Sequence, residues 1–511
     1  MTASTAPRAD TAAVDRASPA DARPRHRDTV HAPLQDWARE APHRLAIDDG
    51  TLRLSFAELA ARVQASAPAP RAAGTAPRPV WVDDALAPGA QLVQFLQTIA
   101  AGDAAAVGDP DWSASVRRTL AERLGAHPAG GAAPPAGLPP ESFYVGFTSG
   151  STGLPKGFVR SHRSWTSSFE ACLDAFGPAA HTTLLAPGRL SHSLFLFGAL
   201  LGLWTGAGVR LQPRFSAAAT LQTLAAGEAL SLVAVPSQLI LMLEQARRHG
   251  PRAIAATRLV MVSGAPWPRA RTPQLRQLFP NARIVEFYGA SETSFIAWTD
   301  SHAELPATAV GRPFAQVDLR IVPPDTAPAD TMLAGSTADP ARPGRIYVRS
   351  PMVFSGYVTP EPSDGPGALL RAGDWLSVGD MGHLDAQGLL HLAGRQQRMF
   401  VVQGKNLFPE EVEHVLAEHP AVASVSVQAV GDAVRGQRAV AVLELSGQVD
   451  RAALVDWCRA RLEAYKTPRA FHLCRSWPRT ASGKTDHGAL ASLLAAHPEG
   501  PPGWSVLPWR S

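Results

Sequence analysis

The chain has few cysteines and no apolar run long enough to cross a membrane. None of its three cysteines belongs to a CxxC pair, which argues against a disulfide framework or a zinc site and favours a reducing cytoplasm: Cys172, Cys458 and Cys474. The longest apolar run, Leu194–Trp204, is shorter than a bilayer-spanning helix and is interrupted by Gly198 and Gly202. We therefore expect neither a membrane protein nor a disulfide-stabilised secreted domain.

Several catalytic motifs and charge patterns are also missing. The sequence holds no GxSxG nucleophile elbow, no HExxH zinc motif and no GxxxxGK[ST] phosphate loop. Its formal net charge is +4, and its arginines are scattered rather than gathered in a basic block, which argues against nucleic acid as a partner. With 511 residues, of which 45% are hydrophobic and 18% charged, the composition is typical of a globular protein with two or more domains.

Residues 1–30 consist mainly of Ala, Pro, Asp, Arg and Ser without periodicity, so we expect them to form a disordered tail. This segment lacks the apolar core of a signal peptide. Its acidic residues Asp10, Asp15 and Asp21 argue against a transit peptide.

The most informative segment is FTSGSTGLPKG, Phe147–Gly157. Its glycines allow the backbone to turn tightly and to aim several N–H groups at one anion, while its hydroxyls and Lys156 add further donors. Such a segment suits a triphosphate, although a glycine- and serine-rich stretch also serves as a flexible connector. A strand expected over Ser142–Phe147 and a helix expected after the loop favour the phosphate site. The helix is indicated by apolar residues at helical spacing: Trp165, Phe169, Cys172 and Phe176.

Farther along the chain, strand-length apolar runs alternate with helical segments. We expect strands over 231–236, 258–264 and 282–289, and helices over 241–249 and 269–278. This alternation predicts a largely parallel sheet covered by helices. Ligands bind such sheets beyond the carboxyl ends of the strands, where SGAP (263–266) and YGASE (288–292) lie.

The rest of the chain changes in texture twice. After Pro306, short strands with Gly and Pro turns predict a β-rich subdomain, and beyond Arg395 two strands, a helix and a further strand predict a small α+β domain. The expected fold is α/β, with a large N-terminal domain of parallel sheets with helices and a β-rich subdomain, followed by the small C-terminal domain. The expected bounds are 31–395 for the large domain, 396–495 for the small domain and 496–511 for a C-terminal tail.

Taken together, these segments resemble the adenylate-forming superfamily of AMP-binding enzymes, which includes acyl-CoA synthetases, luciferases and the adenylation domains of peptide synthetases. The resemblance extends from about Leu54 to Leu490 and rests on several motifs in the expected order. It implies an acid–thiol ligase, in which a carboxylate attacks ATP to give an acyl-adenylate and pyrophosphate, and a thiol then displaces AMP. ATP and Mg²⁺ are the implied cofactors, and CoA is the implied co-substrate.

The resemblance assigns ATP binding to the glycine-rich loop and to the motifs at the strand ends. Lys156 is expected to act on the departing pyrophosphate, Tyr288 to stack on adenine, and Ser291, which stands where threonine is usual, to bond the α-phosphate. Glu292 is expected to bind Mg²⁺. The expected ATP- or AMP-binding residues are Thr148, Ser149, Gly150, Ser151, Thr152, Gly153, Gly264, Ala265, Glu286, Tyr288, Gly289, Ser291, Asp380 and Arg395.

Further roles are implied around the junction of the two domains. Asp380 is expected to accept hydrogen bonds from the ribose hydroxyls, and Arg395 to hold ribose and phosphate. Gln397 stands at the hinge position of the family, where Asp or Lys is usual, so a mobile small domain is expected to pivot there. In the string PRTASGKTDHGAL near the C-terminus, Lys484 resembles the lysine that bridges the substrate carboxylate and ATP. The expected catalytic residues are Lys484, Glu292 and Lys156.

The segment Leu190–Trp204 matches the part of the family that lines the acyl pocket. It begins with LSH, where amino-acid-activating relatives carry an aspartate for the α-ammonium group, so an α-amino acid is not expected. We expect a fatty or aryl acid and a pocket that includes His192, Leu196 and Ser237. His192 is either a gate at the pocket or a packed histidine.

The acceptor of the acyl group and the activity itself each have an alternative. The string QGKN (403–406) replaces the Gly-Gly-Glu-Asn that is frequent in the family, so a carrier protein stays open as an acceptor beside CoA. An inactive paralogue that only binds nucleotide is the other alternative. The joint presence of five residues argues against it: Lys156, Glu292, Asp380, Arg395 and Lys484.

Overall fold

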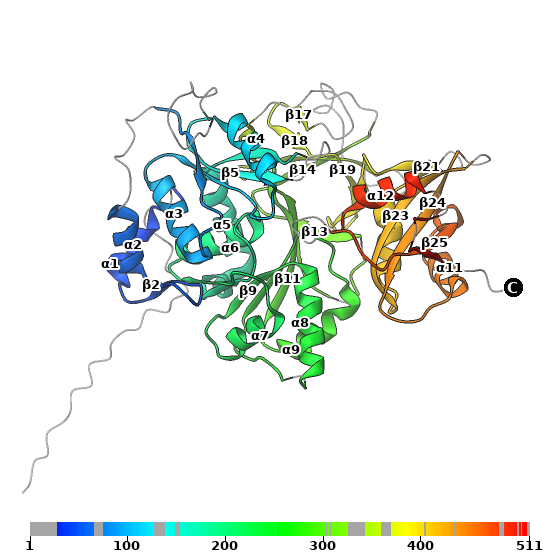
Figure 1. Cartoon of the computed structure of the whole chain (residues 1–511), viewed down its shortest axis with the longest axis horizontal. Helices are drawn as coiled ribbons and strands as arrows, with labels where there is room; N and C mark the ends of the chain where they lie inside the picture. The colour runs from blue at the N-terminus through cyan, green and yellow to red at the C-terminus, as the bar shows by residue number, and fades with distance from the viewer. Residues whose placement is uncertain are drawn as a thin grey trace, which may run out of the picture.

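The computed structural model describes residues 28–65, 75–125, 138–148, 154–250, 252–302, 304–306, 308–324, 343–358, 369–402, 405–432, 436–479, 485–497, 500–501 and 503–507. The larger and smaller parts of the chain lie next to each other along the longest axis of the molecule (Figure 1). Residues 1–27 of the expected N-terminal tail lie outside the described residues. Val30 is only 3% exposed, so the end of the expected tail belongs to the folded part.

The largest sheet contains the predicted parallel strands. Neighbouring strands are parallel along the order β11-β10-β9-β7-β8-β1, and the sheet continues with antiparallel strands at both ends. The strands of this part are β1 (Leu45–Asp48), β2 (Arg53–Ser55), β7 (Leu184–Ala186), β8 (Val209–Leu211), β9 (Ser231–Ala234), β10 (Leu259–Val262), β11 (Arg283–Ala290), β12 (Ser294–Asp300) and β13 (Ala309–Pro313). The predictions of strands over 231–236, 258–264 and 282–289 are confirmed.

Helices cover both faces of these strands, because successive side chains of a strand point to opposite faces. Leu232, Val260 and Ile284 belong to one hydrophobic cluster with α7 (Ala217–Ala225), α8 (Pro236–Arg248) and α9 (Thr272–Leu278). Val233, Met261 and Val285 belong to the other cluster, with α5 (His162–Phe176) and α6 (Ser193–Trp204). In Figure 1 the helices α7, α8 and α9 lie together below β9 and β11.

Helix α8 starts earlier than predicted. We expected a helix over 241–249, whereas α8 begins at Pro236, which occupies the first turn. Proline suits that position because its missing N–H has no partner within a helix at this point. Helix α9 is preceded by a 3₁₀ turn over Arg269–Arg271, so the prediction of a helix over 269–278 is confirmed in substance.

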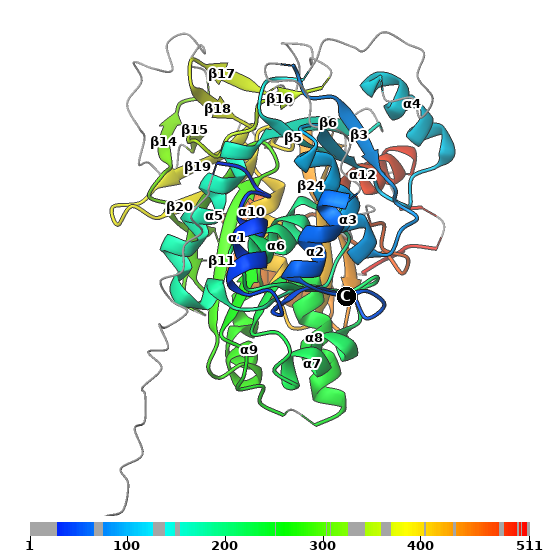
Figure 2. The same cartoon turned by 90° about the vertical axis from the view of Figure 1, so that its left-hand side faces the viewer.

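A second sheet carries the glycine-rich loop. Its order is β16-β6-β5-β4-β3, with β3, β4 and β5 parallel and β6 antiparallel to β5. Figure 2 shows the helices of the N-terminal region beside it. The elements are α1 (Pro33–Glu40), α2 (Phe56–Ala65), β3 (Pro79–Val82), α3 (Pro88–Ala100), β4 (Ala104–Val107), α4 (Ala114–Leu124), β5 (Ser142–Thr148), β6 (Lys156–Ser161) and β16 (Gly356–Tyr357).

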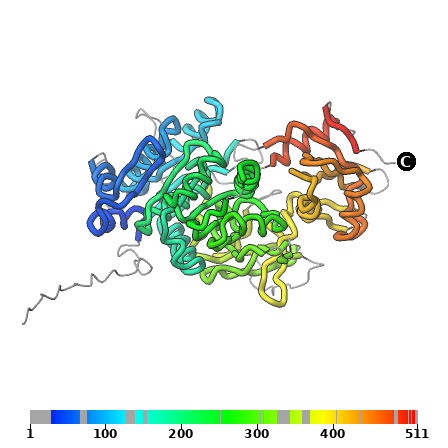
Figure 3. The backbone as a smooth tube through the Cα atoms, turned by 90° about the horizontal axis from the view of Figure 1, so that it is seen from below, coloured from blue at the N-terminus to red at the C-terminus, as the bar shows by residue number. Residues whose placement is uncertain are grey.

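The predicted β-rich subdomain and small α+β domain are both present. The first comprises β14 (Asp318–Val322), β15 (Gly344–Arg349), β17 (Leu370–Ala372), β18 (Trp375–Ser377), β19 (Asp380–Leu384) and β20 (Leu390–Arg395). The second comprises β21 (Phe400–Val402), β22 (Lys405–Leu407), α10 (Pro409–Ala417), β23 (Val422–Asp432), β24 (Gly436–Leu445), α11 (Arg451–Arg459), β25 (Ala470–Leu473), α12 (His487–Ala496) and β26 (Ser505–Val506). Figure 3 shows this second group gathered at the C-terminal end of the tube. The predicted α/β fold class is confirmed.

The expected C-terminal tail over 496–511 needs a correction. Strand β26 pairs antiparallel with β25, and Leu507 is only 9% exposed. The stretch is rich in proline and glycine, and a two-residue strand held by its neighbour leaves no periodic pattern in the sequence.

Helix α6 contains the whole of the longest apolar run, and it is a core helix. Ten of its twelve residues are buried, from Phe195 to Trp204, so it is apolar on every side. Within the described ranges, no helix combines the length and the apolar composition that a bilayer crossing requires.

The segment before α1 encloses two histidines. The backbone N–H of Val30 donates to Nδ1 of His162 (3.2 Å), and the rings of His31 and His162 lie 5.5 Å apart. Burial lowers the pKa of His31 from 6.5 to about 4 and that of His162 from 6.5 to about 3. Below about pH 6.5 the unfolded chain therefore binds more protons than the folded chain. The stability that the two buried, neutral histidines contribute is therefore complete above that pH. It is expected to be lost as the pH decreases toward 4.

Replacing His31 with leucine is expected to make this acid-induced loss of stability shallower, because leucine cannot take up a proton. Denaturant unfolding between pH 6.5 and 4 measures the difference, and each pKa unit corresponds to about 1.4 kcal/mol. His249→Leu is the matched control, since His249 is exposed. If the pH dependence of both variants equals that of the wild type, His31 does not govern the acid sensitivity.

Candidate active site

The carboxyl ends of β7, β9, β10 and β11 meet at one edge of the largest sheet. The side-chain amide of Gln238, in the first turn of α8, donates to the carbonyl of Pro187 just after β7 (2.8 Å). The hydroxyl of Ser263, just after β10, donates to the carbonyl of Phe287 in β11 (2.8 Å). The structure thus brings together segments that hold these predicted residues: His192, Ser237, Gly264, Ala265 and Tyr288.

Two of the predicted glycines sit where a side chain would not fit or would be strained. Gly264 adopts φ +90°, in the left-handed region that favours glycine, and it is exposed together with Ala265. A Cβ on Gly289 would lie 1.8 Å from the carbonyl oxygen of Ser294. Gly289 is therefore required by the close approach of β12, whereas the exposed backbone at Gly264 carries no side chain and suits close approach of a flat ligand.

The setting of the glycine-rich loop differs from the expected strand, loop and helix. The loop joins the antiparallel strands β5 and β6, with Thr148 opposite Lys156, and α5 follows only after β6. The short run that follows Lys156 was not recognised as a strand because the helical spacing after it dominated the pattern. The predicted phosphate-binding residues Ser149, Gly150, Ser151, Thr152 and Gly153 lie outside the described residues.

Glu292 is held close to the first residue of β6. The hydroxyl of Tyr357 donates to Oε1 of Glu292 (2.8 Å), and the backbone N–H of Phe354 donates to the Glu292 carbonyl (2.8 Å). Nζ of Lys156 lies 6.0 Å from the centroid of the same Tyr357 ring. Two of the predicted catalytic residues, Lys156 and Glu292, are thus gathered around one tyrosine.

Asp380 connects Tyr288 and Arg395. The Tyr288 hydroxyl donates to Oδ2 of Asp380, and Nε of Arg395 donates to Oδ1 (3.1 Å). Asp380 is only 7% exposed, and these two donors stabilise its buried carboxylate. Burial and the neighbouring Asp380 raise the pKa of Tyr288, and Asp380 raises the pKa of Arg395. The side chain of Arg395 stays 57% exposed, so its guanidinium has room for a further partner.

Glu286, a predicted ATP-binding residue, has both carboxylate oxygens engaged by Arg269. Nε of Arg269 lies 3.0 Å from Oε1, and Nη2 lies 3.0 Å from Oε2. The same guanidinium donates to the carbonyls of Pro306 and Ala309, each at 2.6 Å. These contacts fix β11 to β13. A direct contact of Glu286 with ATP stays a prediction.

The start of the predicted acyl-pocket segment is tied to the loop after β4. Arg189 donates to Asp109 (2.9 Å) and to Asp111 (2.6 Å), and the hydroxyl of Ser191 donates to Asp109 (3.2 Å). A carboxylate therefore does lie beside this segment, but Arg189 pairs with it. Sequence reasoning missed Asp109 because it stands 80 residues away from Arg189.

The three predicted pocket residues differ in their surroundings. His192 is partly buried before the first turn of α6, and Ser237 is exposed in the first turn of α8. Leu196 is fully buried in the larger hydrophobic cluster. Their contact with an acyl group stays a prediction.

The predicted hinge residue Gln397 lies exposed in a tight turn between β20 and β21. On one side, the backbone N–H of Gln396 donates to Gly379 (3.0 Å), and Arg345 donates to the Gln396 side chain (3.1 Å). These contacts tie Gln396 to the large domain. On the other side of Gln397, Arg398 belongs to a different network.

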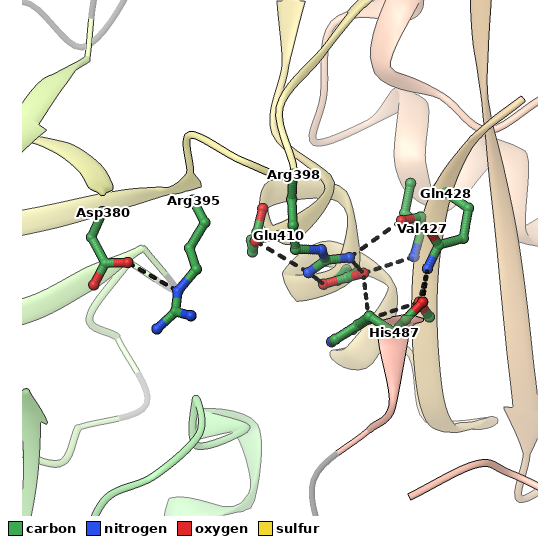
Figure 4. A network of polar contacts seen from close by, with 9 residues as sticks. Asp380, Arg395, Arg398, Glu410, Val427, Gln428 and His487 are labelled. Carbon is green, nitrogen blue, oxygen red and sulfur yellow. Dashed lines mark hydrogen bonds and ion pairs between the residues drawn. The ribbon is translucent and has the colours of Figure 1, made fainter. Parts of the chain in front are cut away.

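Arg398 binds two glutamates of α10, and Figure 4 shows its contact with one of them, Glu410. Its guanidinium donates to Glu410 (3.1 Å) and Glu413 (2.5 Å), and Glu413 accepts from the backbone N–H of Val427 in β23 (2.7 Å). His487, the first residue of α12, bonds the Ser426 hydroxyl at 2.8 Å. The turn, α10, β23 and α12 are thus joined inside the small domain.

The predicted catalytic residue Lys484 lies outside the described residues. The chain on either side of it is described: Arg479 and Thr485 form an antiparallel bridge, and Nε1 of Trp477 donates to the Thr485 hydroxyl (3.1 Å). Asp486 accepts from the backbone N–H of Ala489 and so caps α12 (2.9 Å). The two ends of the segment with Lys484 are therefore held together and attached to the small domain.

Three residues of this region were missed by sequence reasoning: Arg160, Arg269 and Tyr357. A signal existed for Arg160, since a charged residue in the apolar strand FVRS requires a buried partner. Tyr357 is one of only five tyrosines in the chain, but nothing local pairs it with Glu292.

Comparisons with known proteins agree with the resemblance. The AMP-binding enzyme family matches residues 83–358, and the AMP-binding enzyme C-terminal domain matches residues 411–484. An acyl--CoA ligase of Bacillus subtilis named YhfT, itself uncharacterized, is 36% identical over 357 residues, which cover 70% of this chain and 69% of that protein. Indoleacetate--CoA ligase of Aromatoleum aromaticum is 29% identical over 362 residues, 70% of this chain and 68% of that protein.

The fold is also that of a solved synthetase. The o-succinylbenzoate CoA synthetase MenE from Bacillus subtilis, in complex with its acyl-adenylate intermediate, superposes with a TM-score of 0.73 at 23% identity. The superposition covers 89% of this chain and 97% of that one.

Fold and family match together define an adenylate-forming enzyme, an AMP-forming ligase of the acid–thiol type. The chain belongs to the AMP-binding enzyme family. The candidate residues suit a magnesium nucleotide: the Glu292 carboxylate has oxygens of the kind that Mg²⁺ prefers, and the backbone at Gly264 is exposed and carries no side chain.

Proposed function

We propose that this enzyme activates a fatty or aryl carboxylic acid with ATP and transfers the acyl group to CoA. The observation that carries the proposal is the continuous set of contacts from Lys156 through Tyr357 to Glu292. Glu292 follows β11, the strand that bears Tyr288, and Tyr288 in turn bonds Asp380 of β19. These groups suit the successive parts of a nucleoside triphosphate. Lys156 is a cation for the phosphates, Glu292 is a metal ligand beside them, and Asp380 is an acceptor for the ribose hydroxyls.

In the first half-reaction, a carboxylate oxygen attacks the α-phosphorus and the bond to pyrophosphate breaks. Lys156 stabilises the charge on the departing pyrophosphate, and Ser291 donates to the α-phosphate. Asp380 accepts from the ribose hydroxyls, and its two donors hold its carboxylate in place beforehand. Glu292 would hold a magnesium ion, which would supply positive charge against the phosphate oxygens. Lys484 neutralises charge where carboxylate and phosphate meet.

In the second half-reaction, the small domain turns about Gln397 and a thiol attacks the acyl carbonyl, with AMP as the leaving group. The proposed domains are 31–395 and 396–495, although the contacts of Gln396 are with the large domain and those of Arg398 with α10, so the change of partners falls one residue later, at Gln397. The domain movement removes Lys484 and gives the thiol access. Exclusion of water in the meantime protects the mixed anhydride from hydrolysis.

The acid lacks an ammonium group next to its carboxylate. Asp109 and Asp111, the carboxylates that lie beside the start of the acyl-pocket segment, are both engaged by Arg189, and the segment Leu190–Trp204 itself holds no carboxylate for an ammonium group. The helix that follows, α6, is apolar throughout and suits an alkyl chain or an aromatic ring. The three buried free thiols are compatible with a cytoplasmic location.

A panel of fatty, aryl and amino acids in ATP–pyrophosphate exchange tests the proposal. We expect exchange with fatty or aryl acids and none with amino acids, because a buried ammonium group would lack a counter-charge. Thioester formation is then measured with CoA and, separately, with a carrier protein. If thioester forms only with the carrier protein, the carrier protein and not CoA is the acceptor. If the protein binds ATP but exchanges pyrophosphate with none of the acids, it is an inactive nucleotide-binding paralogue.

A further inference from the structure

Arg160 is a buried arginine that has no part in either proposed half-reaction. It lies in β6, four residues after Lys156, and is only 2% exposed. Burial lowers the pKa of Arg160 to about 9, so its guanidinium is still positively charged at neutral pH. A charge in this position needs partners that compensate for lost water.

The hydrogen-bond acceptors of Arg160 within the described residues are carbonyls and one hydroxyl. Nη1 donates to the carbonyl of Ser291 (2.8 Å), and Nη2 donates to the carbonyl of Met352 (2.7 Å). Nε donates to the hydroxyl of Ser164 (3.1 Å). The charge of Arg160 is attracted by Glu292, the residue after Ser291. The guanidinium therefore acts on the turn that carries Glu292 by a hydrogen bond and by charge.

Arg160 connects three parts of the candidate site: its own strand β6, the turn with Ser291 and the segment with Met352. Strand β6 begins with Lys156, the Ser291 carbonyl precedes Glu292, and Met352 lies two residues before Phe354, whose N–H binds the Glu292 carbonyl. Ser291 and Met352 stand 131 and 192 residues from Arg160 in sequence. One planar group thus fixes the distance between the strand of the phosphate lysine and the turn of the metal-binding carboxylate.

We propose that Arg160 is a positioning residue for metal-dependent ATP binding, which holds the Ser291–Glu292 turn in register with the strand that bears Lys156. This inference rests on the proposed function for the role of Glu292. Arg160 acts through the turn and touches neither substrate nor metal. The guanidinium fork can bond two carbonyls from different segments at once, which a lysine ammonium on a single stem does with less directional control.

The experiment compares Arg160→Met and Arg160→Lys with the wild type and with Arg451→Met. Arg451 is a matched control, because it is 9% exposed and donates to a backbone carbonyl, that of Arg469, in the small domain. Calorimetry measures ATP binding with and without Mg²⁺ in the absence of any acid. We expect Arg160→Met to lose about 10- to 100-fold in the Mg²⁺-dependent part of ATP affinity, Arg160→Lys to lose less, and Arg451→Met to keep it.

Two further measurements separate positioning from a merely structural role. Thermal unfolding reports the stability of each variant, and thioester formation from supplied acyl-adenylate reports the half-reaction that needs no pyrophosphate release. The proposal is supported if Arg160→Met keeps this second half-reaction while the Mg²⁺ needed for half-maximal pyrophosphate exchange rises about 10-fold or more. It is overturned if both half-reactions fall in proportion, or if the Mg²⁺ requirement is unchanged.

The outcome for Arg160 can be distinguished from the outcome for the proposed function. If none of the acids in the panel supports pyrophosphate exchange by the wild type, the proposed function fails. The binding measurement, which needs no acid, still decides the role of Arg160. If Arg160→Met does not fold, Arg160→Lys decides, because it keeps the charge and loses the fork. A Mg²⁺ dependence of ATP binding equal to the wild type in Arg160→Lys then refutes the proposal.

Discussion

Replacing Lys484 with alanine is expected to abolish adenylation while thioester formation from supplied acyl-adenylate stays near the wild-type rate. The lysine is proposed to stabilise charge that develops only when the carboxylate attacks phosphorus, so its loss should reduce pyrophosphate exchange by about 100- to 1000-fold. Exchange kinetics with the best acid, and single-turnover thioester formation with CoA, measure the two half-reactions separately.

Lys484→Arg is the matched variant, since it keeps the positive charge but changes its shape. We expect it to recover only part of the exchange rate, because the guanidinium is larger than the ammonium group. The described ends of this segment are joined by the Arg479–Thr485 bridge, so neither substitution should affect the fold. Equal losses in both half-reactions would contradict a role confined to adenylation.

Replacing Glu292 with glutamine is expected to have the second large effect. The substitution preserves the size of the side chain and an acceptor for the Tyr357 hydroxyl, but it removes the negative charge that a divalent cation requires. Pyrophosphate exchange is expected to fall about 100-fold at ordinary Mg²⁺ concentrations and to recover in part at high Mg²⁺. Magnesium titrations of the exchange rate measure both effects.

Glu122→Gln serves as the control for this prediction, because it removes the same charge from an exposed position in α4. We expect its magnesium titration to superimpose on that of the wild type. An unchanged magnesium requirement in Glu292→Gln would argue against metal binding by this carboxylate, whatever the size of the loss in rate.

The sequence was sufficient for the parallel sheet and for the edge at which ligands bind. Strands β9, β10 and β11 are short apolar runs between helices, and this pattern depends only on neighbours in sequence. The residues at their carboxyl ends are then brought together by the topology itself. For that reason Gly264 and Tyr288 could be placed near each other without a structure.

Contacts between distant segments could not be read from the sequence. Arg160 binds carbonyls of Ser291 and Met352, and a carbonyl has no side-chain identity that a sequence could reveal. Asp109 likewise compensates Arg189 across 80 residues. Such pairs depend on how two sheets pack against each other, and no local periodicity records it.

Strand β6, which follows the glycine-rich loop, could not be recognised in the sequence either. The helix α5 was predicted correctly, but its strong spacing hid the strand β6 that lies between it and the loop. This strand matters chemically, because it fixes Lys156 opposite Thr148 and carries Arg160 into the interior. A lysine at the start of a paired strand has a defined direction, which a lysine in a free loop would lack.

The contacts on either side of Gln397 have a consequence for the number of degrees of freedom in the proposed domain movement. Gln396 is bonded to Gly379 and Arg345, and Arg398 is bonded to Glu410 and Glu413. A peptide chain has only two soft dihedral angles per residue. With the side chains of both neighbours held by opposite sides of the turn, the orientation of the small domain depends largely on the φ and ψ of Gln397, and a rotation there also strains the bonds from the N–H groups of Arg398 and Met399 to the Arg395 carbonyl (3.0 and 3.2 Å). The path between the two half-reactions is then confined largely to rotations about two bonds.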